Sequence, residues 1–133
     1  MKLDYLTIKR MMMEKNMADG GYVAYGKNNQ KFAIYMGGVI GALATADLKS
    51  HIVSMKDNKI VITPFTKNGI EFENAYGFEK EKIQSVKLSL FGTLKIFING
   101  EKHEYAIEKG QKDVRMILEI LGFAKKKNNK KQS

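Results

Sequence analysis

The sequence contains no cysteine, and this absence excludes several kinds of chemistry. Without a thiol the chain forms no disulfide bond, holds no metal through thiolate ligands and has no cysteine nucleophile. Zinc fingers are excluded with them. Proline is scarce as well: the single one, Pro64, cannot donate a hydrogen bond to a β-ladder, so it predicts a strand end or an edge strand.

Catalytic and metal-binding signatures are also missing. The two histidines, His51 and His103, occur without an HExxH motif, a histidine pair or a nucleophile elbow. His103 alternates with Tyr105 and Ile107 on the inward face of an expected strand, which indicates a structural histidine. We therefore expect a protein that is not an enzyme and has no catalytic residue, no metal site and no cofactor. An enzyme that uses His103 is the least favoured alternative, because the sequence offers no partner residue for it.

No basic segment followed by a long apolar run opens the chain, so no secretory signal is indicated. The uncharged stretch at residues 32–46 (FAIYMGGVIGALATA) has fifteen residues, whereas a membrane-spanning helix needs about 20. The predicted location is the cytoplasm, with peripheral attachment to the inner face of a membrane as the alternative.

Small residues recur within the uncharged stretch, and their spacing permits close approach of another backbone. We expect a strand over residues 31–36 and a short helix over residues 39–48. The pattern Gly38-x-x-Gly41 lacks the first glycine of a dinucleotide fingerprint, and hairpins rather than βαβ units follow it. The small residues instead form a candidate interface with the domain or with a second copy of it, made by Gly37, Gly38, Gly41 and Ala42.

Alternation of apolar and polar residues predicts strands in the second half of the chain. Val86, Leu88 and Leu90, for example, share one face of a strand. The pairs Asp57-Asn58 and Asn99-Gly100 tolerate positive φ and predict hairpin turns. Residues 22–31 fit a further short strand followed by a polar turn. The seven strands counted in the expected fold cover residues 31–36, 51–56, 59–65, 69–75, 83–90, 93–98 and 102–107.

Helical periodicity occurs near both ends of the chain. After Gly110, apolar residues fall at positions i, i+3, i+4 and i+7 of one helical face, and Gly122 ends that helix. The face consists of Val114, Ile117, Leu118 and Leu121. Residues 4–17 predict a second helix, capped by Asp4, with Leu6, Met13 and Met17 along one side.

The expected fold class is mainly β with α. Close strand spacing and hairpin turns favour a seven-stranded antiparallel barrel or sandwich, capped by the C-terminal helix and preceded by an extra N-terminal helix. At 133 residues, 44% of them hydrophobic, one domain with a core of its own is expected.

The order of strands and final helix resembles the pleckstrin-homology (PH) superfold, particularly bacterial PH-like and GRAM-like domains. The phrase KIVIT at residues 59–63 is similar to their second-strand region, and EKIQSV at residues 81–86 is similar to the segment that enters the fifth strand. The resemblance covers residues 31–122. It implies basic loops near the first strands that bind acidic lipid headgroups, and the residues in the matching region are Lys27, Lys31, Lys56 and Lys59.

The net charge of +9 is unevenly distributed. Residues 125–133 (KKKNNKKQS) carry five lysines and no acid, which leaves +4 for residues 1–124. Such a tail cannot bury apolar surface, so we expect it to be disordered and to follow a single domain over residues 1–124. It is also a candidate for electrostatic attachment to anionic lipid or nucleic acid through Lys125, Lys126, Lys127, Lys130 and Lys131.

These patterns favour a non-catalytic PH-like binding or scaffolding module. Its expected partner is another protein or a second copy of the chain, with an anionic membrane surface as a further option. The alternative is a charge-driven nucleic-acid-binding protein. That alternative requires several aromatic side chains on one face for base stacking, and the strand patterns place only Phe97 clearly outward. No small-molecule substrate is indicated.

Overall fold

The computed structural model describes residues 4–26, 50–66 and 68–124. Within these ranges the chain forms two α-helices and two antiparallel sheets, and the strands do not close into a barrel. The mainly β fold with α-helices therefore agrees with the sequence. Of the two arrangements expected, barrel or sandwich, the described strands form two separate sheets and not a closed barrel. The strand expected at residues 31–36 and the helix expected at residues 39–48 lie outside the described residues.

In chain order, all described strands of one sheet come before those of the other. Helix α1 (Tyr5–Glu14) comes first, followed by a five-stranded sheet, sheet A. A three-stranded sheet, sheet B, comes next, and helix α4 (Gln111–Leu121) ends the fold. Sheet A contains β1 (Val23–Gly26), β2 (Ser50–Lys56), β3 (Lys59–Thr66), β4 (Gly69–Ile70) and β5 (Tyr76–Glu79), and sheet B contains β6 (Ser85–Leu88), β7 (Thr93–Ile98) and β8 (Glu101–Ala106).

The hairpin turns form where the sequence predicts them. Asp57 and Asn58 have φ values of 51° and 62°, and Lys56 pairs with Lys59 across the two-residue turn. Asn99 and Gly100, with φ values of 51° and 79°, join β7 to β8 in the same way. Positive φ at both central residues is the signature of the type I′ turn. These turns fix the registers of the two longest hairpins.

The strand expected over residues 69–75 is wrong, because the structure divides this segment. Only Gly69–Ile70 pairs with β3 there, a 3₁₀ turn covers Phe72–Asn74, and pairing with β3 resumes in β5. The interruption lies beside Pro64. Its carbonyl accepts a hydrogen bond from the Glu71 N–H at 2.9 Å, so its missing N–H also faces this edge. The proline thus weakens the edge pairing without affecting the pairing of β3 with β2.

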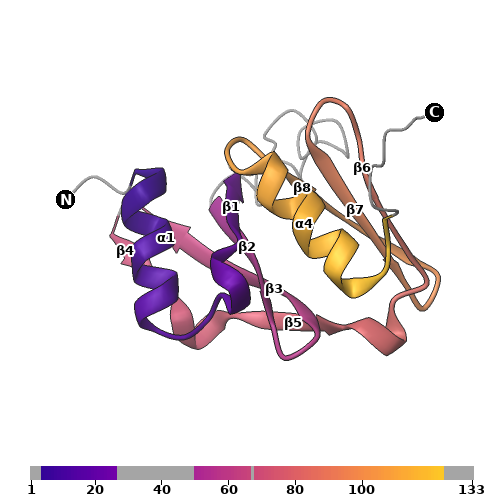
Figure 1. The fold of residues 1–133 in the computed structure, drawn as a ribbon, viewed down its shortest axis with the longest axis horizontal. Helices are drawn as coiled ribbons and strands as arrows, with labels where there is room; N and C mark the ends of the chain where they lie inside the picture. Colours follow the sequence, from indigo (N-terminus) through magenta and orange to yellow (C-terminus); the bar gives the residue numbers. More distant parts are fainter. Residues whose placement is uncertain (1–3, 27–49, 67, 125–133) are drawn as a thin grey trace, which may run out of the picture.

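Sheet A is covered on both faces (Figure 1). On one face, Ile8 and Met12 of α1 are fully buried and pack in a cluster with Ile52 of β2. Ser54 on the same face donates a hydrogen bond to the Met17 carbonyl at 2.8 Å. Asp4 caps α1 by accepting from the Thr7 N–H at 2.8 Å, as expected. The N-terminal helix therefore belongs to the packed structure through its Ile8–Met12 stripe.

The side of α1 on which the sequence places Leu6 and Met13 does not face the sheet. Leu6 and Met13 are 74% and 54% exposed, while Met17, which follows the helix, is half-buried in the cluster. Ile8 and Met12 are one turn apart and lie on the same side of the helix. With apolar residues spread around this helix, the sequence alone does not decide which stripe meets the sheet.

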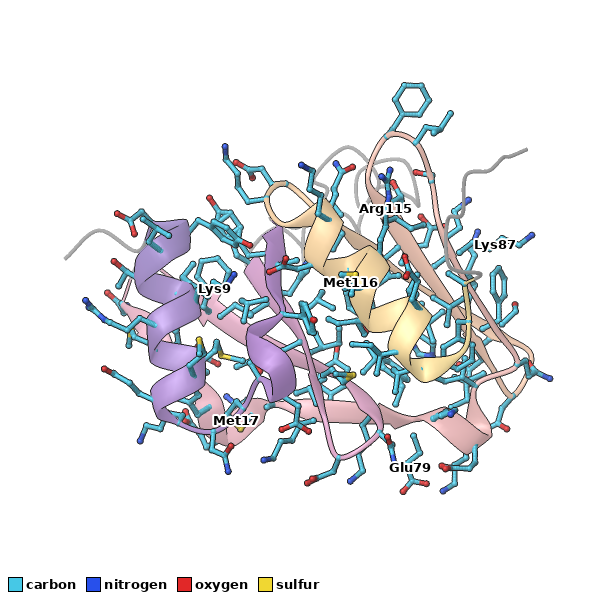
Figure 2. All side chains as sticks on the ribbon, viewed as in Figure 1. Lys9, Met17, Glu79, Lys87, Arg115 and Met116 are labelled. Atoms are coloured by element: carbon cyan, nitrogen blue, oxygen red, sulfur yellow. The ribbon has the colours of Figure 1, made fainter. Side chains whose placement is uncertain are left out.

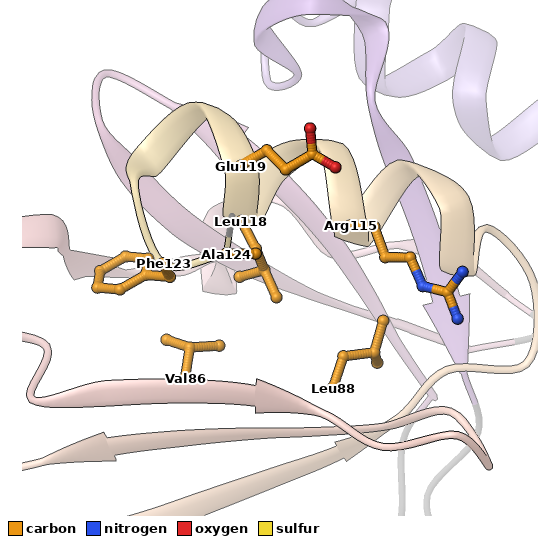
Figure 3. Close-up of a pocket in the computed structure, with 7 residues that line it drawn as sticks. All are labelled: Val86, Leu88, Arg115, Leu118, Glu119, Phe123 and Ala124. Carbon is orange, nitrogen blue, oxygen red and sulfur yellow. The ribbon is translucent and has the colours of Figure 1, made fainter. Parts of the chain in front are cut away.

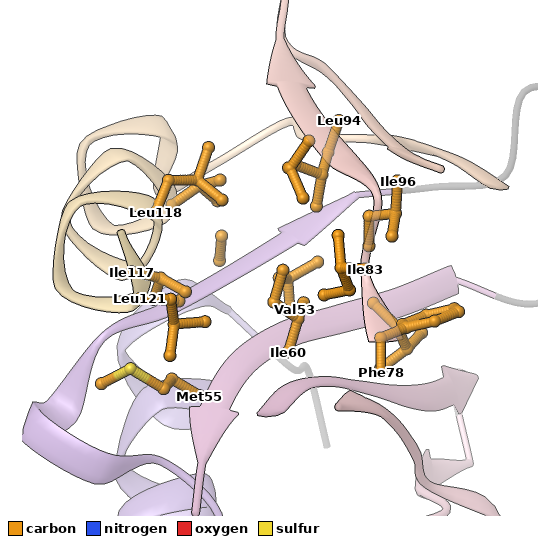
Figure 4. Close-up of a cluster of buried hydrophobic side chains, with 14 of the residues drawn as sticks. Val53, Met55, Ile60, Phe78, Ile83, Leu94, Ile96, Ile117, Leu118 and Leu121 are labelled. Carbon is orange, nitrogen blue, oxygen red and sulfur yellow. The ribbon is translucent and has the colours of Figure 1, made fainter. Parts of the chain in front are cut away.

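The other face of sheet A packs against sheet B and α4. The helix contributes all four residues of its predicted stripe, each no more than 4% exposed. Figure 4 shows Ile117, Leu118 and Leu121 facing Val53 and Met55 of sheet A, with sheet B closing the other side of the cluster. Gly122, with φ 89°, ends α4 in the left-handed conformation expected of a C-terminal glycine.

The two sheets meet where β1 runs beside residues 106–110. The Tyr25 N–H donates to the Lys109 carbonyl at 2.9 Å, and the Tyr25 carbonyl accepts from the Glu108 N–H at 2.8 Å. At Gly26 a Cβ atom would collide with the Ala106 carbonyl oxygen. The backbones thus approach more closely than a side chain at this position permits.

One carboxylate joins both helices to β1. Asp113, in the first turn of α4, accepts hydrogen bonds through Oδ2 from the Tyr5 hydroxyl at 3.1 Å, Lys9 Nζ at 3.3 Å and the Val23 N–H at 3.1 Å. The Tyr5 hydroxyl also lies 2.9 Å from the Val23 carbonyl. Burial, together with the charge of Asp113 and the hydrogen bond to it, raises the pKa of Tyr5 to about 12. Asp113 therefore fixes α1, β1 and α4 relative to one another.

Two isoleucines of α4 test whether this helix closes the core. Ile117 is 1% exposed and Ile120 is 49% exposed. We expect Ile117→Ala to lower the free energy of unfolding by about 2–5 kcal/mol because it leaves a cavity, and Ile120→Ala by less than about 1 kcal/mol. Urea denaturation followed by circular dichroism measures both. Equal losses in the two variants would contradict the packing of α4 described here.

Candidate functional site

Strand β6 forms an open edge of sheet B. Among the described residues it pairs only with β7. The Ser89 N–H donates to the Thr93 carbonyl at 2.9 Å, so Ser89 and Thr93 are a hydrogen-bonded pair. Because such pairs alternate along an antiparallel ladder, Lys87 and Ser85 also direct their backbone groups to β7. The N–H and C=O groups of Val86 and Leu88 therefore point away from β7, toward the open edge.

An apolar groove lies beside this edge, between β6 and α4. Its volume is about 240 Å³. Figure 3 shows Phe123 over Val86, Leu118 between the helix and the strand, and the Arg115 side chain passing above Leu88. Glu119 lies on the outer side of the helix in the same view. The groove is lined by Val86, Leu88, Arg115, Leu118, Glu119, Phe123 and Ala124.

The opposite face of sheet B carries lysines. Lys87 of β6 pairs directly with Lys95 of β7, and Lys95 pairs with Glu104 of β8. Glu104 in turn forms an ion pair with Lys102 of its own strand at 2.8 Å. Figure 2 shows Lys87 extending outward from β6, away from α4. Phe97, the outward aromatic expected from the sequence, lies on this face and is half-buried. It is the only aromatic side chain that the described strands place there.

The turn between β6 and β7 exposes two large apolar side chains. Leu90 is 89% exposed and Phe91 is 95% exposed. The alternation predicts Leu90 on the same face as Val86 and Leu88, and this prediction is wrong. The strand ends at Leu88 and the chain turns over Ser89–Gly92, with Gly92 at φ 83° and its N–H donating to the Ser89 carbonyl. The turn thus presents Leu90 and Phe91 to solvent.

The structure places two of the four lysines that the PH resemblance suggests. Lys56 and Lys59 are cross-strand partners at the tip of the β2–β3 hairpin. Lys56 forms an ion pair with Asp19 at 3.5 Å, and Asp19 also accepts from the Asp57 N–H at 2.9 Å. Lys27 and Lys31 lie outside the described residues. The site for acidic headgroups therefore stays a prediction, with one of its lysines already paired.

Two further candidate sites lie outside the described residues. They are the small-residue interface of Gly37, Gly38, Gly41 and Ala42, and the basic tail with Lys125, Lys126, Lys127, Lys130 and Lys131. Both stay predictions from the sequence.

The buried histidine is His51 rather than His103. His51 is 6% exposed, and its Nε2 lies 2.7 Å from the Ala106 carbonyl, which requires the proton on that nitrogen. No described residue donates to its buried Nδ1. The ring stands edge-on to Tyr105 with centroids 5.2 Å apart. Burial lowers the pKa of His51 below its usual value of 6.5, while the hydrogen bond to Ala106 opposes this shift.

His103 contacts an aromatic ring of sheet A. It is half-buried, and its ring packs on Phe78 of β5 at 5.1 Å. Beside it, the hydroxyls of Tyr76 and Tyr105 are 2.8 Å apart and join β5 to β8. Burial and this hydrogen bond raise the pKa of Tyr105. Both histidines thus lie at the contact between the sheets, where they contribute to packing.

Groups of three histidine, aspartate or glutamate side chains able to hold a metal ion do not occur within residues 4–26, 50–66 and 68–124. In the same ranges no helix has the length and apolar character needed to cross a bilayer. Comparisons with protein-family models, with curated proteins and with solved structures found no match.

The protonation of His51 predicts a pH-dependent stability. Well above pH 6.5 the ring is neutral in the folded and unfolded states, so pH has no effect through this group. Below pH 6.5 the unfolded chain takes up a proton that the folded chain resists, and the free energy of unfolding falls, by at most about 1.4 kcal/mol per pH unit. Urea denaturation between pH 7.5 and 5, above the range where carboxylates titrate, measures this loss.

Two variants separate His51 from the other histidine. His51→Gln removes the titrating group and is expected to flatten the pH dependence in this window, whatever its effect on the absolute stability. His103→Gln is expected to keep it. An unchanged pH dependence in His51→Gln would show that burial of His51 is not its source.

Proposed function

We propose that this protein is a non-catalytic interaction module of PH-like fold, which captures an extended segment of a partner protein by strand addition to β6. The fold component of the proposal is supported by the arrangement of the strands. Sheet A has three full strands and an interrupted edge formed by β4 and β5, sheet B has three strands, and a C-terminal helix packs between the sheets. This order of two antiparallel sheets and a final helix is the one that the resemblance implies.

The observation that carries the binding component is the open β6 edge beside the apolar groove. A strand added there receives main-chain hydrogen bonds from Val86 and Leu88, and every second side chain of that strand points into the groove. Strand addition uses these two features together: backbone bonds supply affinity, and pockets for alternate side chains supply specificity. A second strand also satisfies backbone groups of β6 that pair with no described strand.

A proline substitution distinguishes the two sides of β6. Leu88→Pro removes only an outward N–H, so we expect the fold to persist and strand addition to be lost. Lys87→Pro removes an N–H that points to β7, and we expect it to destabilise the protein by several kcal/mol. Peptides selected from a random display library on the purified protein are the probes. Their binding is followed through the amide resonances of Val86 and Leu88.

The proposal requires that selected peptides shift those two resonances and that Leu88→Pro, still folded by circular dichroism, no longer binds them. A library that yields no peptide, or peptides that bind Leu88→Pro and the original protein equally, would refute strand addition at β6.

A second candidate function, attachment to an anionic membrane, is favoured by the Leu90–Phe91 turn. Two adjacent apolar side chains project from a hydrogen-bonded turn, and basic groups flank them: Arg115 beside Leu88, and the Lys87–Lys95 pair on the other face. Apolar side chains that enter the interface while lysines and arginines meet anionic headgroups bind a bilayer additively.

Vesicle co-sedimentation tests this second function. We expect the double variant Leu90→Ser/Phe91→Ser to lose most binding to vesicles of phosphatidylserine and phosphatidylcholine. The matched control Leu6→Ser/Met13→Ser removes two exposed apolar side chains of α1 and is expected to bind like the original protein. Equal binding by the two double variants would rule out the β6–β7 turn as the membrane contact.

A further inference from the structure

The lysine pair at the β6 edge carries a charge that the described part of the fold does not neutralise. Lys87 and Lys95 are direct cross-strand neighbours, an arrangement that destabilises a sheet. On the far side of Lys95 stands Glu104, which is already bonded to Lys102 at 2.8 Å. Lys87 forms no ion pair with any described residue. Its open side is the side on which a partner strand would lie.

The geometry of strand addition fixes what Lys87 would meet. A partner strand bonds to the backbones of Val86 and Leu88, so the residue opposite Lys87 occupies a non-hydrogen-bonded position. Cα atoms at such positions are only about 4.5 Å apart, and their side chains interact most closely. That residue lies on the lysine face of sheet B. The residues before and after it point to the other face, into the groove with Leu118 and Phe123.

We infer that β6 selects a partner strand in which one acidic residue stands between two apolar residues. This inference rests on the proposed strand addition. The acidic side chain lies beside Lys87, with Lys95 next in the same row, and relieves their repulsion. The apolar side chains fill the groove. The partner is therefore an acidic, alternating peptide segment, and Lys87 determines its specificity.

Two other possible occupants, the C-terminal segment of this chain and a second copy of the protein, fit the edge less well. Residues 125–133 (KKKNNKKQS) follow directly on the groove residue Ala124, but they contain neither an apolar nor an acidic side chain. A second copy paired two-fold through β6 and centred on Lys87 would place two Lys87 side chains opposite one another. Like charges at this position oppose that pairing.

Three synthetic peptides test the inference on the full-length protein. The probe is acetyl-Gly-Ser-Val-Glu-Leu-Ser-Gly-amide, and the other two carry Gln or Lys in place of the central Glu. Titrations followed at the Val86 and Leu88 amide resonances give the dissociation constants. We expect Glu to bind about two- to five-fold more tightly than Gln, and Lys to bind most weakly. Raising the salt to 0.5 M reduces these differences.

Charge reversal at the selecting residue provides the decisive comparison. In Lys87→Glu we expect the order of the three peptides to invert. The control Lys112→Glu changes the net charge equally at an exposed position of α4 and is expected to keep the original order. Inversion in the first variant alone supports selection by Lys87, whereas inversion in both would show a general charge effect and overturn the inference.

The remaining outcomes separate this inference from the proposed function. Equal binding of all three peptides at Val86 and Leu88 overturns the acidic preference and leaves strand addition standing. Binding by none of them overturns the inference, and strand addition falls with it only if the display library also yields no peptide at this edge. A concentration-dependent dimer in sedimentation velocity that Leu88→Pro abolishes would show that a second copy occupies the edge, which also overturns it.

Discussion

The close contact between β1 and residues 106–110 holds the two sheets in place. Gly26 permits the backbone of β1 to reach Ala106, and Gly110, in the left-handed conformation, lies against Val23 and Ala24. Side chains at either glycine would push the sheets apart. The hydrogen bonds of Tyr25 to residues 108 and 109 then satisfy the outer side of β1, which would otherwise be a second open edge. The width of the gap that α4 fills follows from this contact.

The position of α4 in turn determines the groove. The buried stripe of α4 determines how closely the helix packs on the two sheets, and Asp113 holds its first turn against α1 and β1. Leu118 then faces the core while Arg115 and Glu119 remain at the rim, and Phe123, just beyond the Gly122 cap, extends the apolar wall over Val86. The proposed binding surface therefore needs no element of its own. This surface is the groove between the core helix α4 and the edge strand β6.

The sequence predicts those parts of the fold that depend on local rules. The four-residue stripe of α4, the Asp57-Asn58 and Asn99-Gly100 turns and the bounds of β7 all follow from periodicity and backbone preference. The interruption of the strand after Ile70 does not follow from local rules. Pro64 signals a defect in the pairing, but the sequence does not show which of the two neighbouring strands faces the missing N–H. β5 was missed for a related reason: its four residues run into the charged segment Glu79–Lys82, which resembles a connection.

The candidate site was less predictable than the fold. Alternation assigns Leu90 to a buried face, but the register of the β6–β7 hairpin places it in the turn. Among the described strands β6 pairs only with β7, and Lys87 lies opposite Lys95. Both facts depend on which strands pair, and the local sequence pattern does not predict that. The PH resemblance identifies its basic residues only by their position in the chain, which does not predict their contacts. The structure describes only Lys56 and Lys59, and it pairs the first with Asp19.

The short length of β6 and its central lysine also bear on solubility at high protein concentration. An open edge can template stacking of identical chains into fibrils, and long, flat, uncharged edges do so most readily. Here the edge is four residues long with a lysine inside it, and the opposite edge of sheet A is broken at the 3₁₀ turn Phe72–Asn74. Neither of these two edges offers a long uniform surface for stacking. If β6 pairs with a partner strand as proposed, its short length and its central lysine limit stacking of identical chains at the same edge.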